Sequence, residues 1–191
     1  MSSDITNTTK NRGTFIDDRD GHVYKWVRIG NQRWMAENLA YMPHVSPPGE
    51  REGTVYSSGY GIWSGVSYVT PPNEPGQIAG IWVYRYNGNN DNVAEAKCTV
   101  EYKTYGCLYD WGTAFKVVPK GWHLPTDEEW LILSDYLGDS DIAGGKLKEV
   151  GTSHWRNPNT NATNEVGFSG LPGGAGIFGV ASPKVANMAI G

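Results

Sequence analysis

The sequence has little positive charge and no long apolar run. Its 191 residues include 16 lysines and arginines against 20 aspartates and glutamates, which gives a net charge of −4. A nucleic-acid partner is not expected, because such partners are bound through basic patches. No apolar stretch approaches the roughly 20 residues of a transmembrane helix. The opening MSSDITNTTKNRG lacks the apolar core of a signal peptide, so we expect either a cytoplasmic protein or one whose leader was removed.

Motifs of common enzymes are missing as well. We find no glycine-rich phosphate loop, no nucleophile elbow, no histidine pair at helical spacing and no evident pair of glycosidase carboxylates. The oxygen-rich stretches DDRDG (17–21) and NGNNDN (87–92) are compatible with a structural calcium ion, but neither completes the calcium loop of an EF-hand. Both are predicted to be polar turns. We therefore expect no enzymatic activity, no cofactor and no metal site.

Turn residues and aromatic rings are abundant instead, with 25 glycines, 11 prolines, 8 tryptophans and 11 tyrosines. This composition favours a loop-rich, turn-rich protein over a helical bundle. From Thr14 onward, apolar and polar residues alternate between Asp-Gly and Gly-Asn turns, which predicts antiparallel β-hairpins. In the strand VYKWVRI (23–29), successive side chains should face opposite sides. Residues 1–13 are predicted to be a flexible tail.

The second half of the chain predicts two short helices. Leu108, Trp111 and Phe115 recur at helical spacing, which indicates a helix over 108–116. The stretch GWHLP (121–125) should follow as a brief strand. A second helix over 127–137 is predicted from the stretch PKGWHLPTDEEW (119–130) and the apolar stripe beyond it.

The stretch 119–130 contains one histidine and three carboxylates, yet its pattern is that of a helix start. Thr126 and Glu129 have the spacing of a capping box, and the helix dipole favours carboxylates in the first turn. Successive side chains of one turn point in different directions, so they cannot converge on one metal ion. His123 is expected to be a packed or hydrogen-bonded histidine rather than a ligand.

Tryptophans in polar loops are the candidates for a binding surface. Trp63 lies in YSSGYGIWSGVSYV (56–69), and Trp155 precedes the amide-rich RNPNTNATNE (156–165). Flat rings suit sugar recognition because they stack on C–H faces while amides bond hydroxyls. The predicted ligand-binding residues are Trp63, Trp155, Arg156, Asn157 and Asn159, although either tryptophan could equally be a core residue. Four other tryptophans are expected in the core, namely Trp34, Trp111, Trp122 and Trp130.

The sequence does not decide whether the two cysteines form a disulfide. Cys98 and Cys107 lie nine residues apart. The pair is compatible with one disulfide in an exported protein and equally with two thiols. If the protein is exported, we predict an intrachain disulfide.

Five ordered segments carry a resemblance to a known family. They are GNQRWMAENL, NVAEAKCTVEYKTYGCLYDW, PKGWHLPTDEEWLILSDYLG, AGGKLKEVGTSHW and PNTNATNEVGFSGLPGG. From about Thr14 to Gly174, the chain resembles the Fibrobacter succinogenes major paralogous domain. The resemblance implies an α+β, C-type-lectin-like fold with N-terminal β-hairpins, many loops and two short helices packed on a small antiparallel sheet. This fold is related to that of formylglycine-generating enzymes. It also implies an extracellular or cell-surface location and a role in adhesion or polysaccharide binding.

Residues 175–191 depart from the family's pattern. Members continue after LPGG with an aromatic segment and closing strands, whereas this chain reads AGIFGVASPKVANMAIG. We interpret these residues as an atypical tail, which is either a native ending or a frameshift product. In the second case, the domain lacks its last strands. Either the tail folds back to cover the unpaired sheet edge as a makeshift strand, or a neighbouring chain supplies the missing pairing. Because the tail is a poor strand former, we expect self-association through strand edges near residues 165–191.

The function predicted from the sequence is that of a binding or adhesion module for a glycan or a surface protein. Two alternatives remain open. One is a structural subunit of a surface assembly, which would pair its strand edges with neighbours. The other is a modifying enzyme of the formylglycine-generating type, which would need reactive cysteines in the part of that fold that this chain lacks.

Overall fold

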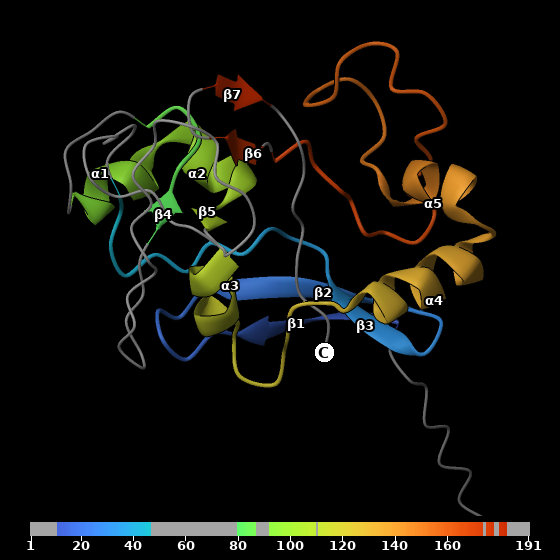
Figure 1. Cartoon of the computed structure of the whole chain (residues 1–191), viewed down its shortest axis with the longest axis horizontal. Coiled ribbons are helices and arrows are strands. Elements are labelled where there is room, and N and C mark those ends of the chain that lie inside the picture. Colours follow the sequence, from blue (N-terminus) through green and yellow to red (C-terminus); the bar gives the residue numbers. More distant parts are fainter. Residues whose placement is uncertain are drawn as a thin grey trace, which may run out of the picture. The chain divides into compact units, whose positions relative to one another are not determined.

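The computed structural model describes residues 11–46, 80–86, 92–109, 111–173, 175–177 and 180–182 (Figure 1). These residues fall into two compact units. The first unit contains the described residues up to Glu37 and those from Pro125 to Gly170. The second contains those from Asn38 to Leu124 and from Leu171 onward.

The first unit begins with a three-stranded antiparallel sheet of order β1-β2-β3, formed by β1 (Arg12–Ile16), β2 (Val23–Ile29) and β3 (Gln32–Met35). The predicted hairpins are thus confirmed. Gly30, in the turn between β2 and β3, has a φ of 58°, a conformation that glycine adopts without strain. Because β1 starts at Arg12, the predicted tail of residues 1–13 is two residues too long.

Two helices follow in the same unit, α4 (Asp127–Leu137) and α5 (Ser140–Leu147). The capping box of α4 is confirmed: Glu129 N–H donates to Thr126 Oγ1 (3.2 Å), and Thr126 N–H donates to Glu129 Oε2 (2.8 Å). At the start of α5, Asp139 Oδ1 accepts the backbone N–H groups of Asp141 and Ile142. Each cap satisfies N–H groups that have no partner inside the helix.

One hydrophobic core joins the sheet to these helices. Trp34 on β3 is 1% exposed, and its ring lies 4.6 Å from the ring of Trp130 on α4, centroid to centroid. The buried core residues are Val27, Ile29, Trp34, Leu133, Leu137, Ala143 and Phe168. The expected apolar stripe of α4 therefore faces the sheet through Leu133 and Leu137.

The second unit contains short elements. Strands β4 (Ile81–Trp82) and β5 (Leu108–Tyr109) pair in antiparallel fashion. Three helices are described here, α1 (Val93–Cys98), α2 (Val100–Tyr105) and α3 (Trp111–Val117). The first two begin at asparagine and threonine caps, Asn92 and Thr99, whose side-chain oxygens accept first-turn N–H groups.

Two predictions for this region are wrong. The helix predicted over 108–116 begins only at Trp111, because Leu108 and Tyr109 pair with β4 as strand β5. Phe115, counted in its apolar stripe, is 58% exposed. The strand predicted over 121–125 is reduced to a single bridge residue, His123, whose side chain is exposed.

The predicted disulfide is also wrong. Cys98 is exposed on α1, whereas Cys107 is buried with its Sγ 3.8 Å from the carbonyl oxygen of Ala40. A disulfide needs two Cβ atoms about 4 Å apart with facing side chains. The thiol of Cys107 is instead turned towards the buried backbone of residue 40.

The segment that begins the predicted tail forms strands. Strand β6 (Ala175–Ile177) pairs with β7 (Val180–Ser182) in an antiparallel hairpin in which Ile177 lies opposite Val180. Strand formation at residues 175–177 and 180–182 departs from our expectation that the tail is a poor strand former. Pairing between chains near residues 165–191 stays a prediction.

The fold class is thus α+β, with small antiparallel sheets and short helices, as predicted. Among the expected core tryptophans, Trp34 is buried while Trp122 and Trp130 are half-buried, and the side chain of Trp111 lies outside the described residues. Within the described part of the chain, every helix is too short or too polar to cross a lipid bilayer.

Candidate functional site

A long irregular loop, residues 148–170, leaves the end of α5 and returns to it (Figure 1). Its two ends are hydrogen-bonded: Glu149 N–H donates to the carbonyl of Gly170 (3.1 Å), and Gly170 N–H donates to the carbonyl of Leu147 (2.8 Å). Its middle is tied to α5 by Thr163 N–H, which donates to the carbonyl of Gly145 (3.0 Å). The backbone of this loop is therefore positioned by specific bonds even though it has no helix or strand.

The loop also contains several residues in the left-handed region. Asn161, Asn164 and Ser169 have φ values of 58°, 48° and 58°. Asparagine tolerates this conformation because its short side chain bonds locally, and Asn164 does so with Ser169. At Gly145 the loop approaches α5 so closely that a Cβ atom would collide with the carbonyl oxygen of Asn161. A glycine at this helix position thus permits the contact.

Asn159, predicted to bind ligand, is turned into the loop. Its Nδ2 group donates to two backbone carbonyls, those of Glu149 (2.7 Å) and Gly151 (2.8 Å). Its Oδ1 atom is buried and has no hydrogen-bond partner among the described residues. These bonds give Asn159 a structural role in holding the loop closed, while its contact with a ligand stays a prediction.

Trp155 is half-buried and anchored at one edge. Its Nε1–H donates to the carbonyl of Gly170 (3.0 Å), so the indole spans the two ends of the loop. The ammonium group of Lys148 lies 5.4 Å from the centre of the ring, within the range of a cation–π contact, and donates to the carbonyl of Thr160. The part of the ring that remains accessible is therefore held in a fixed orientation next to a positive charge.

Arg156 and Asn157 follow directly and are exposed. The structure thus brings three predicted ligand residues, Trp155, Arg156 and Asn157, to one well-anchored segment. The neighbouring imidazole of His154 lies with its Nδ1 atom 2.8 Å from Glu149 Oε2, which adds another link across the loop. Trp63, the remaining predicted residue, lies outside the described residues.

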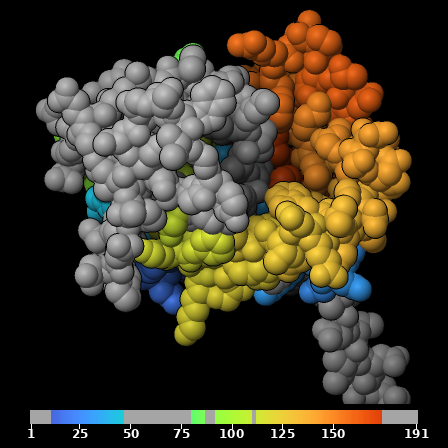
Figure 2. All heavy atoms as spheres, in the orientation of Figure 1, coloured from blue at the N-terminus to red at the C-terminus, as the bar shows by residue number. Residues whose placement is uncertain are grey.

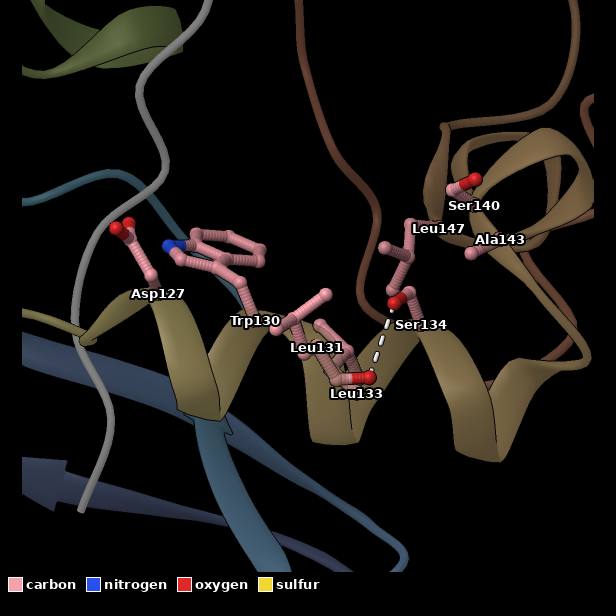
Figure 3. Close-up of a pocket in the computed structure, with 8 residues that line it drawn as sticks. All are labelled: Asp127, Trp130, Leu131, Leu133, Ser134, Ser140, Ala143 and Leu147. Atoms are coloured by element: carbon pink, nitrogen blue, oxygen red, sulfur yellow. Dashed lines mark hydrogen bonds between the residues drawn. The ribbon is translucent and has the colours of Figure 1, made fainter.

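A second feature, not found by the sequence reasoning, is a groove between α4 and α5. Its volume is about 470 Å³, inside the range of roughly 300–1,000 Å³ that is common for ligand pockets. Figure 3 shows Asp127 and Trp130 towards one end, and Ser140, Ala143 and Leu147 on the facing helix. The lining residues are Asp127, Trp130, Leu131, Leu133, Ser134, Ser140, Ala143 and Leu147.

This groove is mainly apolar and offers few polar groups. The hydroxyl of Ser134 donates to the carbonyl of Leu131 (2.9 Å), which directs its proton back to its own helix (Figure 3). The carboxylate of Asp127 stands at the exposed start of α4. The groove arises because α5 folds back beside α4. Asp139 as a helix cap, followed by Ile142, Ala143 and Leu147, is the sequence signal that could have revealed α5.

No metal centre emerges from the residues that the structure describes, because no three or more histidine, cysteine, aspartate or glutamate side chains gather in them. In the polar turn 17–21, Asp17 is 3% exposed and accepts from Arg19 at Nε (2.8 Å) and Nη2 (2.5 Å). These bonds from Arg19 hold the pKa of Asp17 below its ordinary value, against the opposing effect of burial. The carboxylate is thus used for an internal ion pair.

Comparison with known proteins gives one match. Residues 27–182 match the Fibrobacter succinogenes major domain, which reaches into the β6–β7 hairpin. No curated protein and no solved structure matches the chain.

Proposed function

The chain belongs to the Fibrobacter succinogenes major domain family, and we propose that it is an extracellular or cell-surface binding module for polysaccharide. In this proposal the domain adopts the C-type-lectin-like arrangement that the sequence resemblance implies. The ligand is bound by Trp155, Arg156 and Asn157 in the 148–170 loop. The protein acts by adhesion and catalyses no reaction.

The observation that carries the proposal is the fixed geometry of this loop. Asn159 bonds the backbone at residues 149 and 151, and Trp155 bonds it at residue 170. A segment that is already ordered loses less entropy when a ligand binds, so more of the contact energy appears as affinity. Two polar side chains, Arg156 and Asn157, remain exposed on this ordered segment.

The chemistry of the three residues suits a sugar. An indole face can pack on the C–H groups of a pyranose, while a guanidinium group and an amide donate hydrogen bonds to ring hydroxyls. Lys148 beside the indole and Arg156 after it place positive charge at the loop. Glycans that bear carboxylates or sulfates should therefore bind more tightly than neutral ones.

The test is a glycan array that carries neutral and acidic polysaccharides, probed with the purified full chain. The informative variant combines Arg156→Ala with Asn157→Ala, because both side chains are exposed and their loss should leave the fold intact. The matched control combines Asn11→Ala with Arg12→Ala. That pair has the same residue types, is also exposed and lies at the start of β1.

We expect the loop variant to lose at least about tenfold in affinity for the best glycan, while the control binds like the unchanged protein. Trp155→Phe should weaken binding less than Trp155→Ala, since a ring remains. Equal binding by the loop variant and the control, with both folded by circular dichroism, would refute the assignment. Binding to no glycan on the array would refute the proposed ligand class.

A further inference from the structure

Two arginines lie directly opposite each other on the β1–β3 sheet. Arg28 on β2 and Arg33 on β3 are register partners. The N–H group of Arg28 donates to the carbonyl of Asn11 (2.8 Å), so its backbone bonds are directed to β1 rather than to β3. In such a pair the facing side chains lie closest, with Cβ atoms about 5 Å apart. Like charges at directly opposite positions destabilise a sheet.

Arg28 has no partner for its charge among the described residues. Its Nε atom is buried without a hydrogen bond, and no carboxylate forms an ion pair with it in that part of the chain. The acidic residues that follow β1 and β3 are engaged elsewhere. Asp17 pairs with Arg19. Glu37 Oε1 lies 2.7 Å from the ammonium nitrogen of Lys25, whose side chain alternates to the opposite face of the sheet.

The cost of this arrangement cannot be avoided by titration. Arginine stays protonated in proteins, whereas a buried lysine can lose its proton. A half-buried guanidinium group without a partner, next to a second positive charge, therefore lowers the free energy of unfolding. An unsatisfied buried polar group of this kind is typical of a position that an ion or ligand completes.

The neighbouring side chains on this face are held in place. The guanidinium carbon of Arg33 lies 5.6 Å from the centre of the Trp26 ring, within the range of a cation–π contact. Trp26 is the register partner of Gly13 on β1, where a Cβ atom would lie only 2.8 Å from the ring. The missing side chain at Gly13 thus lets the indole lie against β1. Figure 2 shows that atoms of the blue segment, which contains β1 to β3, reach the surface.

We propose that Arg28 and Arg33 form a binding site for one oxyanion group, namely a sulfate, a phosphate or a carboxylate. Because Nε of Arg28 is covered, the anion would meet the two Nη groups, which donate two parallel hydrogen bonds. Arg33, fixed by the indole, supplies a second positive charge from the facing strand. A bound anion converts the repulsion between the two arginines into attraction for a shared partner.

This site is separate from the proposed polysaccharide site. Val27 and Trp34 are register partners whose side chains alternate to the other face of the sheet. Phe168 of the 148–170 loop packs there, in the same core cluster. The oxyanion site therefore lies on the face of the sheet that is turned away from this loop, and neither site requires the other.

The probe is inorganic sulfate, titrated into the isotope-labelled full chain while NMR signals are followed. Sodium chloride is withdrawn to keep the ionic strength constant, so chloride is the matched anion. The reporting signals are the Nε–H of Arg28, the indole N–H of Trp26 and the backbone amide of Arg33. We expect these signals to shift with a Kd of about 10 mM or tighter. Phosphate and acetate are titrated in the same way.

Variants then locate the site. Arg28→Gln should weaken sulfate binding at least about tenfold. Arg28→Lys should weaken it less, because lysine keeps the charge but loses the paired donors. Arg33→Gln should weaken it about threefold or more, through the loss of the second charge. The matched control is Arg12→Gln, because this exposed arginine is the register partner of Val27 and belongs to the other face.

Melting temperatures separate this role from a structural one. Without sulfate and at low ionic strength, Arg28→Gln should melt at the same temperature as the unchanged protein or higher, because it removes a like-charge pair. Added sulfate should then raise the melting temperature of the unchanged protein more than that of the variant. A fall of more than about 4 °C on replacing Arg28 would show that protein contacts hold its side chain, and would overturn the proposal.

The binding data can also refute the site. Equal sulfate binding by the unchanged protein and a folded Arg28→Gln variant would place the anion elsewhere, and an equal loss with Arg12→Gln would show that only overall charge matters. Unmoved signals with all three oxyanions would exclude the ligand class. Methyl sulfate distinguishes the source of the group: if it binds like sulfate, the site accepts a sulfate carried by an organic ligand, and if only inorganic sulfate binds, the ligand is the free ion.

Discussion

Replacing Asn159 with alanine should open the 148–170 loop without unfolding the protein. Asn159 Nδ2 is the shared donor to the carbonyls of Glu149 and Gly151, at 2.7 and 2.8 Å. Alanine has no donor, so both carbonyls lose this partner. Because the two bonds lie within one loop, the change should act on local opening rather than on the hydrophobic core around Trp34.

The size of the effect follows from those two bonds. A typical intramolecular hydrogen bond contributes about 1 kcal/mol net, so the loss should lower the free energy of loop opening by about 2 kcal/mol. An effect of about 2 kcal/mol corresponds to roughly 30-fold faster opening-limited exchange. The side chain is only partly buried, and water can bond the freed carbonyls once the loop opens, so a larger cost is not expected.

Hydrogen–deuterium exchange measures this opening directly. The reporting amides are those of Glu149 and Thr163, which donate to the carbonyls of Gly170 and Gly145. Asn159→Asp should be at least as disruptive as alanine, since a carboxylate cannot donate to a carbonyl. Asn157→Ala is the control, because that side chain is exposed two residues away.

The reasoning fails if Asn159→Ala leaves both amides exchanging within about twofold of the unchanged protein, which is less than about 0.5 kcal/mol. It also fails if Asn157→Ala accelerates exchange as much as Asn159→Ala does. Unchanged exchange at the buried amide of Leu133 in all variants would confirm that the effect is local.

Thr126→Ala should lower the free energy of unfolding by about 1 kcal/mol, because it removes the acceptor of Glu129 N–H, whereas Thr126→Ser should cost little. Urea unfolding measures both, and equal stability of the alanine and serine variants would contradict this role. Asp17→Asn should cost about 1.5–3 kcal/mol near pH 7, because Arg19 then loses the buried carboxylate that is its charged partner. The pKa of Asp17 is lowered in the folded state. The unchanged protein should therefore keep its full excess in free energy of unfolding over Asp17→Asn above about pH 5, and this excess should shrink as the pH falls below about 4. Thermal unfolding of both proteins from about pH 7 down to about pH 3 checks the trend, and a difference that grows on acidification would contradict it.

Short-range features were predictable because their partners are close in sequence. Thr126 and Glu129 are three residues apart, so the pattern alone specified both bonds of the capping box. The β-hairpins were equally predictable from their Asp-Gly and Gly-Asn turns. These elements depend on local turn geometry and capping, which the identities of a few neighbouring residues determine.

Predictions based on the spacing of residues in the sequence failed where a residue made a contact with a distant part of the chain. Leu108 and Phe115 fit a helical stripe, yet Leu108 in β5 pairs with Trp82 in β4, and Phe115 faces water. The spacing of Cys98 and Cys107 permitted a disulfide, but the second thiol is buried against residue 40. In both cases a contact between residues far apart in the chain outweighed the local pattern.

By itself, the sequence determined the family, the α+β class, the hairpins, the cap of α4 and the small set of candidate ligand-binding residues in the 148–170 loop. Only the tertiary structure decided which of those candidates face water. It turned Asn159 inward to bond residues 149 and 151, fixed one edge of Trp155 at residue 170, and left Arg156 exposed. The α4–α5 groove likewise exists only once two helices pack side by side. The physical reason is that burial and side-chain partners depend on long-range packing, which residue spacing does not encode.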